Sequence, residues 1–395
     1  MDTIKKNLDN ITNNNVNYIF LSFIIVFLIL FSFFTWLFNK LRLQGEDSHC
    51  SNYKKNDDTG NLISLSPNEI NNGNLNEYIP SALNNSRTDL FRNFYYLTAY
   101  NCCSGRNYKN NWVNKCALSN ALKIGARCLD FEIYSLNNTP IISTSTTNDY
   151  TVKETYNYIN FDDAMNIIKT DSNSNSNKGP LILLFRIKSL NKIIYNKIGR
   201  TLYNKFYNSE SNNNQLLPYT FNYRFIGENT AKLYTTELKH LKNKIIIAVH
   251  TEYDNFNKTN LSYITNMKVE KEDDANARAV IYRDEELMAK GKSNQKLIND
   301  SKSKFIFVLP SMNNTNKNMD SMLAFSNGCQ CIAMKLQFYD SNLASYYNLF
   351  KTINNDVPSP YALKQFSKRK DKESANISGP GITLEGPDFS EYFNK

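Results

Sequence analysis

The longest apolar stretch of the chain lies near its start, where Tyr18 to Phe38 runs without a charged residue. At about 1.5 Å per helical residue, such a segment spans the hydrocarbon core of a bilayer, which is roughly 30 Å thick. Trp36 lies near one end, and Lys40 and Arg42 follow, as expected at a membrane interface. A cleaved signal peptide is the alternative, but its apolar stretch is shorter and is followed by small residues. The pattern therefore predicts a retained, single-pass transmembrane helix over residues 18–38.

Polar and low-complexity segments divide the rest of the chain. Residues 1–17 form a short polar N-terminus, and residues 39–86 form a linker rich in Asn and Ser. The tail 367–395 is first charged and then rich in Gly and Pro, which predicts a loosely attached end. The main folded domain is therefore expected at 87–366.

Within that domain, short apolar runs alternate with helical patterns. Several runs are continuous in Val, Ile, Leu and Phe, as strands buried on both faces would be. The predicted strands are Phe94–Ala99, Cys128–Tyr134, Leu181–Arg186, Lys244–His250, Ala279–Tyr282, Phe305–Leu309 and Cys331–Gln337, and the predicted helices are Val113–Ile124, Phe161–Lys169 and Leu190–Phe206. This alternation predicts an α/β fold with a parallel sheet. A (β/α)8 barrel and a doubly wound open sheet fit the pattern about equally well.

Composition and charge narrow the class of protein. A hydrophobic fraction of 41% with 25 Tyr and 24 Phe supports a large core and argues against general disorder. The net charge of +9 is spread along the chain without a recognition motif, so we expect no nucleic-acid partner. The 7 cysteines form no CxxC pair and are odd in number, which favours free thiols in a reducing compartment. Because basic residues flank the apolar run on both sides, only this cysteine argument places the main domain on the reducing, cytosolic side.

The segment Gly125-Ala-Arg-Cys-Leu-Asp-Phe-Glu-Ile-Tyr resembles the GCRCxELDxW motif of the phosphatidylinositol-specific phospholipase C family. The other segments that resemble family motifs, in the same order, are Leu97-Thr-Ala-Tyr-Asn (SSHN), Pro140-Ile-Ile-Ser-Thr-Ser-Thr-Thr (PxIYHGHT), Phe161-Asp-Asp-Ala-Met-Asn-Ile-Ile (FxDVxxAI), Gly179-Pro-Leu-Ile-Leu-Leu-Phe-Arg (YPVILSLE), Leu241-Lys-Asn-Lys-Ile-Ile-Ile (LKGKILL), Asn327-Gly-Cys-Gln-Cys-Ile-Ala-Met-Lys-Leu-Gln-Phe (NxGCQMVALNFQT) and Ser359-Pro-Tyr-Ala-Leu-Lys (CGYVLKP). The X-like part covers 90–206 and the Y-like part 279–366. The resemblance implies a TIM-type (β/α)8 barrel of the phospholipase-C-like phosphodiesterase class.

The resemblance also locates the catalytic positions of that family. There, one histidine stabilises the developing phosphorane charge and a second is the general acid/base, beside a calcium ion held by Asn, Glu, Asp and a further Glu. The two histidine positions fall on Tyr100 and Thr144. Neither side chain exchanges a proton usefully at pH 7.

The metal-binding positions are retained only in part. Asn101 matches the family's Asn, and Asp130 and Glu132 occupy the Glu-x-Asp pair with the two residue types exchanged. The last Glu position falls on Arg186, a permanent cation. We therefore expect the two carboxylates to form a salt bridge with Arg186 or with Arg127 in place of a working calcium site.

The positions that contact the headgroup in that family are also altered. Its two lysines fall on Ala248 and His250, and its arginine has no equivalent near residues 312–315. His250 lies at the end of a strand, where barrel enzymes place their chemistry, although a lone histidine is more often structural. Basic residues that are candidates for contacts with anionic phospholipid headgroups, with a solvated helix face as the alternative, are Arg186, Lys188, Lys192 and Lys197.

Three functions fit these observations. The first is a membrane-anchored, catalytically inactive barrel that binds a lipid headgroup or a protein partner and needs no cofactor. The second is an active phosphoric diester hydrolase with a rearranged site, in which Asn101, Asp130 and Glu132 hold calcium and His250 is the acid/base. The third is a scaffold that uses only its outer surface. Because the Asn-rich composition is typical of A+T-rich genomes such as those of giant viruses, a virion or host-membrane role, with the domain inside the virion or the cytosol, is part of this expectation.

The number of catalytic groups that the resemblance implies are missing favours the first hypothesis. A general acid/base contributes about 10²–10⁴-fold to a rate. A missing electrostatic stabiliser removes about 10²–10³-fold more. Losing both histidines and one metal carboxylate would remove most of the catalysis.

Overall fold

The computed structural model describes residues 2–42, 90–147, 152–173, 179–207, 214–224, 232–272, 277–312, 316–353 and 360–369. The chain divides into two compact units, Met1–Lys54 and Lys55–Lys395. Most of the expected linker 39–86 and of the tail 367–395 lies outside the described residues, as do residues 313–315 and Ser359.

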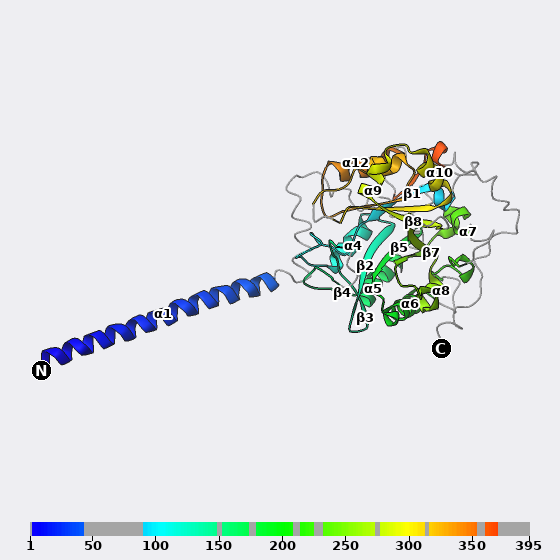
Figure 1. The fold of residues 1–395 in the computed structure, drawn as a ribbon. Helices are drawn as coiled ribbons and strands as arrows, with labels where there is room; N and C mark the ends of the chain where they lie inside the picture. Colours follow the sequence, from blue (N-terminus) through cyan, green and yellow to red (C-terminus); the bar gives the residue numbers. More distant parts are fainter. Residues whose placement is uncertain are drawn as a thin grey trace. The chain divides into compact units, whose positions relative to one another are not determined.

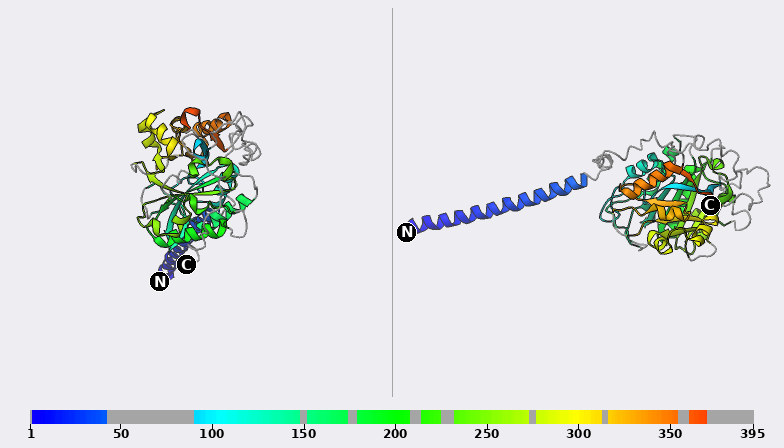
Figure 2. Two further views of the ribbon diagram at one scale, coloured as in Figure 1. Left: turned by 90° about the vertical axis from the view of Figure 1, so that its right-hand side faces the viewer. Right: turned by 90° about the horizontal axis from the view of Figure 1, so that it is seen from above.

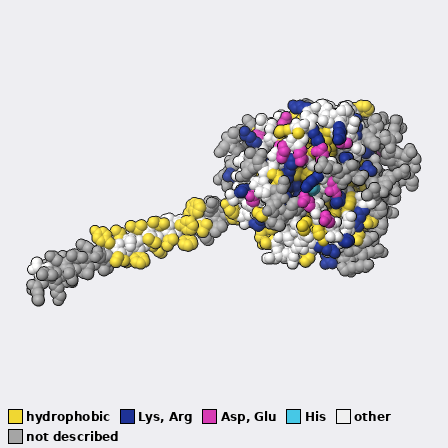
Figure 3. Space-filling view, in the orientation of Figure 1, with side chains coloured by type: hydrophobic (Ala, Val, Ile, Leu, Met, Phe, Trp, Pro, Cys, Tyr) yellow, Lys and Arg dark blue, Asp and Glu magenta, His cyan; other side chains and the backbone are white. Residues whose placement is uncertain are grey.

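The first unit contains a single described helix, α1 (Asp2–Arg42). Its part Tyr18–Leu37 has a mean hydropathy of 2.6 and is long and apolar enough to cross a membrane. Apolar side chains cover the middle of this helix (Figure 3). The hydroxyls of Ser22 and Thr35 donate to the carbonyls of Ile19 and Phe31 at 2.7 and 2.8 Å. Both polar groups are thus satisfied within the helix, as a hydrocarbon environment requires.

The second unit is built around a closed barrel of parallel strands. In chain order they are β1 (Phe94–Ala99), β2 (Cys128–Leu136), β5 (Leu181–Lys188), β6 (Ile245–Thr251), β7 (Met267–Lys271), β8 (Ala279–Arg283), β9 (Phe305–Leu309) and β10 (Cys331–Met334). Each strand pairs with its neighbours in this order, and β1 pairs with both β10 and β2, which closes the sheet. This closure excludes the doubly wound open sheet and confirms the TIM-type barrel.

Further strands and helices surround the barrel (Figures 1 and 2). Antiparallel strands extend the sheet at two places: β3 (Thr139–Ile142) and β4 (Ile159–Asn160) beside β2, and β11 (Tyr361–Leu363) beside β1. The α-helices of this unit are α4 (Lys115–Lys123), α5 (Phe161–Asn173), α6 (Lys192–Phe206), α7 (Lys232–Thr235), α8 (Asn260–Ile264), α9 (Asp284–Lys290), α10 (Gln295–Ser303), α11 (Ser321–Ser326) and α12 (Ser341–Ile353). Short 3-10 turns are η2 (Phe91–Asn93), η3 (Tyr219–Phe221), η4 (Leu238–Leu241), η5 (Phe256–Lys258) and η6 (Phe366–Lys368).

All seven predicted strands are present. Of the barrel strands the prediction omitted β7, and it also omitted the added strands β3, β4 and β11. The sequence of β7, Met-Lys-Val-Glu-Lys, alternates buried and partly exposed positions, and Lys268 forms an ion pair with Glu270. It therefore lacks the continuous apolar run by which the other strands were recognised. The last predicted strand, expected to reach Gln337, ends at Met334, because a turn follows in which the N–H of Phe338 donates to the carbonyl of Lys335.

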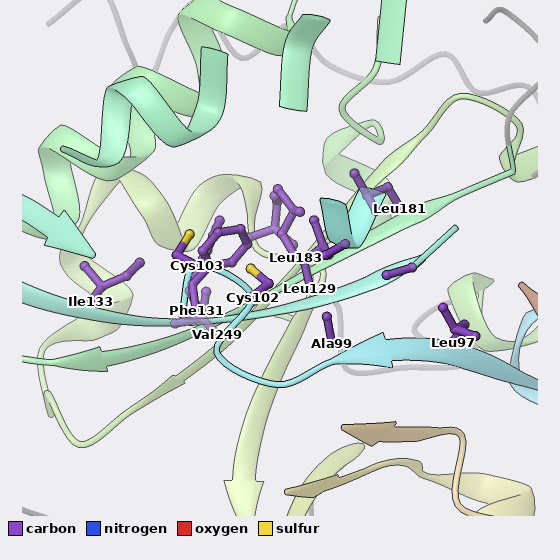
Figure 4. Packing of buried hydrophobic residues seen from close by; sticks show 14 of the residues in the cluster. Leu97, Ala99, Cys102, Cys103, Leu129, Phe131, Ile133, Leu181, Leu183 and Val249 are labelled. Atoms are coloured by element: carbon purple, nitrogen blue, oxygen red, sulfur yellow. The ribbon is translucent and has the colours of Figure 1, made fainter. Parts of the chain in front are cut away.

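The strands bury their two faces in two different cores. Side chains that face the helices include the labelled Leu97, Ala99, Leu129, Phe131 and Leu183 (Figure 4). The alternate residues form a second cluster, which fills the barrel interior and includes Tyr96, Cys128, Ile182, Leu184 and Ala248. Because side chains of a strand alternate with a period of two, the residues after Cys128 and Leu184 on the same face also point inward.

The cysteines depart in part from the expectation of free thiols. Cys102, Cys103, Cys128, Cys329 and Cys331 are free and buried, but Cys116 is in a disulfide. Buried thiols are shielded from oxidants in either compartment, so their reduced state does not identify one. The cysteine argument for a reducing side is therefore lost.

Candidate functional site

Strand register brings the candidate residues together at the C-terminal end of the barrel, which we call the mouth. Glu132 on β2 lies beside Arg186 on β5, and Arg186 lies beside His250 on β6. Asp130 precedes Glu132 by one inward-facing position, and Asn101 lies just past the end of β1. The mouth is where barrel enzymes place their reactive groups.

Arg186 forms a buried, bidentate ion pair with Asp130. Its Nε donates to Oδ1 at 2.7 Å and its Nη2 to Oδ2 at 2.9 Å. The arginine is 2% exposed and the aspartate 0%. Nη2 also donates to Oδ1 of Asn101 at 2.9 Å and lies 3.7 Å from Oε2 of Glu132. Burial lowers the pKa of Arg186, but the two carboxylates outweigh it and raise that pKa well above its ordinary value.

Asn101 completes this network through its backbone and its amide. It has a φ of 41°, a left-handed conformation that asparagine tolerates better than most residues. In this conformation its backbone N–H donates to Oδ2 of Asp130 at 2.9 Å, and its Nδ2 to Oε2 of Glu132 at 3.4 Å. Asn101, Asp130 and Glu132, which the resemblance matches to metal-ligand positions, are therefore connected through Asn101.

Glu132 is held from several sides. The Tyr134 hydroxyl donates to its Oε1 at 3.1 Å, the backbone N–H of Ser145 approaches its Oε2 at 3.3 Å, and Lys188 Nζ lies 3.8 Å from Oε1. Burial, followed by the charge of Glu132, raises the pKa of Tyr134, so the hydroxyl stays protonated and remains a donor. Burial holds the pKa of Lys188 below its ordinary value despite the nearby carboxylate.

Tyr100 and Thr144, which the resemblance matches to the family's two histidines, both make structural contacts. The ring of Tyr100 lies under the Arg186 guanidinium, with 5.3 Å between Cζ and the ring centroid, and meets the Tyr108 ring edge-on at 5.2 Å. The hydroxyl of Thr144 donates to the carbonyl of Tyr108 at 2.9 Å. Tyr108 thus contacts both residues.

His250 stands beside this network. Its Nδ1 lies 2.9 Å from the carbonyl oxygen of Val269, which can only accept, so Nδ1 carries the proton and Nε2 is the free acceptor. Burial is the main cause that lowers its pKa, and the charge of Arg186 adds to it. The imidazole is therefore neutral at pH 7, and its role as an acid/base stays a prediction.

The other basic candidates separate into buried and exposed groups. Arg127, the alternative partner for the two carboxylates, instead reaches Asp171 of α5, with 4.0 Å between Nη1 and Oδ2. Lys192 and Lys197 are exposed on α6 and form part of a solvated face, whereas Lys188 is buried at the mouth. The choice between the two arginines is thus resolved in favour of Arg186.

Lys335 is a residue of the mouth that the sequence analysis did not single out. It follows β10 directly, is 1% exposed, and has its Nζ 5.6 Å from the centroid of the Tyr108 ring. Burial lowers its pKa to about 8, although Asp284 and Asp340 oppose this. Its place immediately after a barrel strand was the signal that could have identified it.

The site does not fit the calcium ion that the family resemblance implies. Both oxygens of Asp130 and the Oδ1 of Asn101 already accept bonds from Arg186. A guanidinium occupies the region in which a cation would need these ligands. Among the described residues, no group of three or more His, Cys, Asp or Glu side chains is arranged to hold a metal.

Among the comparisons with known proteins, the one with solved structures bears on the fold. No family model and no curated protein matches the chain. Among solved structures, the PLC21 of L. pealei matches with a TM-score of 0.55 and 15% identity, over 73% of this chain and 39% of that one. The PLC21 of S. officinalis matches with a TM-score of 0.54 and 15% identity, over 73% of this chain and 38% of that one. The barrel has the phospholipase C fold. Because the chain spans less than half the length of these proteins and shares few residues with them, the likeness concerns the fold alone.

Proposed function

We propose that this protein is a membrane-anchored phospholipase-C-like barrel without catalytic turnover, which binds an anionic phospholipid headgroup at its mouth. The observation that carries the proposal is the buried ion pair between Arg186 and Asp130. It places a fixed positive charge where the family resemblance implies a metal ion. A guanidinium there displaces the metal that the resemblance implies, while Nη1 of Arg186 and the amine of Lys335 would remain as donors for a phosphate.

The absence of turnover follows from the groups at three positions. Tyr100 and Thr144 cannot donate or accept a proton as histidine does near pH 7. Arg186 is held by two hydrogen bonds to Asp130, so it cannot give way to a metal without breaking a buried pair. The remaining imidazole, His250, has no second acid/base group bonded to it among the contacts of the described residues.

The affinity for an anion follows from the basic groups of the mouth. Arg186 and Lys335 are almost completely buried there, and Lys188 nearly so. Nη1 of Arg186 is buried without a hydrogen-bond partner, which leaves donors for a phosphate oxygen. Held near a bilayer by α1, the mouth would meet phosphorylated headgroups at a high local concentration.

A hydrolysis assay tests the catalytic part of the proposal. The full-length protein in detergent, given phosphatidylinositol or its phosphates with and without calcium, should release no inositol phosphate. Calorimetry should detect no calcium binding tighter than about millimolar, the weak end of known sites. Micromolar calcium affinity together with calcium-dependent release would instead establish the active hydrolase built from Asn101, Asp130, Glu132 and His250.

A titration with soluble headgroup phosphates tests the binding part. Lys335→Met should weaken binding about tenfold, because a desolvated charge next to a phosphate contributes on the order of 1.5–3 kcal/mol. Lys197→Met, on the exposed face of α6, is the matched control and should leave the affinity unchanged. Equal affinities in the two variants would exclude the mouth as the binding site.

Carbonate extraction tests the anchor. The full-length chain should remain in the membrane pellet, because Tyr18–Leu37 has the length and hydropathy of a spanning helix. A variant with two Lys residues in place of Ile25 and Leu28 should be released, since each charge disfavours the bilayer centre by about 2.5–3.5 kcal/mol. Recovery of the unmodified chain in the supernatant would exclude the anchor.

A further inference from the structure

Four basic side chains gather at the end of the barrel opposite to the mouth. We call Arg92, Lys364, Lys368 and Arg369 the basal cation cluster. Arg92 lies in η2, which leads into β1, and the other three follow β11 in or beside η6. Because β11 runs antiparallel to β1, its last residues lie beside the start of β1, where the backbone N–H of Lys364 donates to the carbonyl of Asn93 at 2.9 Å. Figure 1 shows the orange-red end of the described chain beside α10.

The two inner members of the cluster are buried. Arg92 is 4% exposed and Lys364 0%. Lys364 Nζ donates to the carbonyl of Ser301 at 3.2 Å and lies 6.0 Å from the centroid of the Tyr95 ring. The side chain of Gln330 links the two, since its Nε2 donates to the carbonyls of Arg92 and Ser301 at 3.2 and 2.9 Å.

The partners of the cluster are neutral. Lys368 Nζ donates to the carbonyl of Phe325 at 3.1 Å, and Arg369 Nε donates to the carbonyl of Lys364. None of the ion pairs among the described residues includes a member of the cluster. Nε of Arg92 is buried without any hydrogen-bond partner. The cluster therefore has excess positive charge and unused donors.

The charges of the surroundings do not compensate for this excess. Burial lowers the pKa of Arg92 to about 10 and that of Lys364 to about 7. The groups that face Lys364 are the thiols of Cys329 and Cys331 and the cations of Arg92 and Lys368. Burial raises the pKa of the Cys329 thiol to about 12, so it is neutral at pH 7 and supplies no negative charge.

We propose that the basal cation cluster binds a phosphate group. Arginine stays charged under all physiological conditions, so a buried guanidinium without a carboxylate calls for an external anion. A phosphate dianion offsets the guanidinium of Arg92 and at the same time favours the charged form of Lys364, which a single carboxylate cannot do. Its oxygens also match the fork of N–H donors on Arg92, while Lys364 and Lys368 supply point charges. This site is separate from the mouth and does not depend on the function proposed for it.

Thermal unfolding of the full-length protein in detergent tests this site. At pH 7, sodium phosphate should raise the unfolding temperature above that in sodium chloride of equal ionic strength, because an anion that binds only the folded state stabilises it. Calorimetry with inorganic phosphate should give a dissociation constant that weakens about tenfold in Arg92→Gln and in Lys364→Met. Lys296→Gln, an exposed change on α10, is the matched control and should bind as the unmodified protein does.

The remaining outcomes distinguish phosphate binding at the base from binding at the mouth and from misfolding of a variant. Should Arg92→Gln fail to fold, Arg92→Lys keeps a charge and Lys364→Met still reports on the site. An equal response to phosphate in all variants, or no response in the unmodified protein, would overturn the proposal. Loss of the response in Lys335→Met would also overturn it, by placing the phosphate at the mouth. Glycerol phosphate, titrated beside inorganic phosphate, tells a lipid headgroup from free phosphate by which of the two binds more tightly.

Discussion

The mouth and the basal cation cluster each bury an arginine, but among the described residues only the arginine of the mouth is paired with a carboxylate. At the mouth, Arg186 lies 2.7 Å from Asp130 and its charge is compensated within the protein. At the base, Lys364 donates to the carbonyl of Ser301 and lies 6.0 Å from the centroid of the Tyr95 ring, and the charged groups that face it are the cations of Arg92 and Lys368. A buried cation with its own counter-charge becomes part of the fold. A buried cation without one attracts an external anion more strongly.

The buried basic residues at the two ends of the barrel are held in place in different ways. In the mouth, the arginine fills a position at which the family resemblance implies an acidic metal ligand, and its geometry is set by the two hydrogen bonds to Asp130. At the base, the cations are assembled by backbone pairing of β11 with β1 and not by attraction to a carboxylate. The following variants test this contrast, from the largest expected effect to the smallest.

Replacing Arg186 by Met should have the largest effect. It leaves Asp130 and Glu132 buried without a cation, and breaking such a pair destabilises a protein by about 3–5 kcal/mol. The uncompensated carboxylates would then have raised pKa values in the folded state, so the loss should be smaller at pH 5 than at pH 8. Urea unfolding at the two pH values measures this. The double variant with Asp130→Asn should recover part of the loss, and an unchanged stability of the single variant would show that the pair is not structural.

Replacing Lys364 by Met should change the pH dependence of stability. Burial holds the pKa of Lys364 at about 7 in the folded state, whereas the unfolded chain keeps its proton up to about pH 10.5. Between these values the unfolded state binds more protons, so stability rises with pH by up to about 1.4 kcal/mol per pH unit. The variant should lose this rise between pH 7 and 9 in phosphate-free buffer. Parallel curves for both proteins would mean that Lys364 is charged in the fold.

Replacing Arg186 by Glu should improve calcium binding at the mouth. The change removes the cation from Asp130 and Asn101 and adds a third carboxylate, which are the oxygen ligands that calcium prefers. We expect about a tenfold gain in affinity by calorimetry, measured against Arg186→Gln, which removes the charge without adding a carboxylate. A gain of the same size in Arg186→Gln would show that removing the cation is sufficient.

Replacing Thr144 by Val should have the smallest effect. The change removes the hydrogen bond to the carbonyl of Tyr108, which contributes about 1 kcal/mol. If the position has no catalytic role, headgroup binding and the absence of hydrolysis should both be unchanged. Thermal unfolding and the hydrolysis assay measure the two quantities. A measurable change in turnover would assign Thr144 a chemical role.

Much of the barrel was predictable because its strands are buried on both faces. Seven of them appear in the sequence as apolar runs. The helices α5 and α6 appear as amphipathic patterns, and both begin within two residues of their predicted starts. The exception, β7, carries Lys268 and Glu270 on its partly exposed face, and its pairing with β6 and β8 is visible only in the closed sheet. A short strand with alternating charges has no local signal that separates it from a loop.

By itself, the sequence determined the apolar segment 18–38 and the alternation of strands and helices. Those features are local, since hydrophobic periodicity and residue identity can be read within a few positions. Only the tertiary structure decided that Arg186, and not Arg127, pairs with Asp130, because strand register selects which side chains share the barrel interior. It alone also brought Arg92 next to Lys364, residues far apart in the chain whose burial and missing counter-charge arise from packing between β1, β11 and α10.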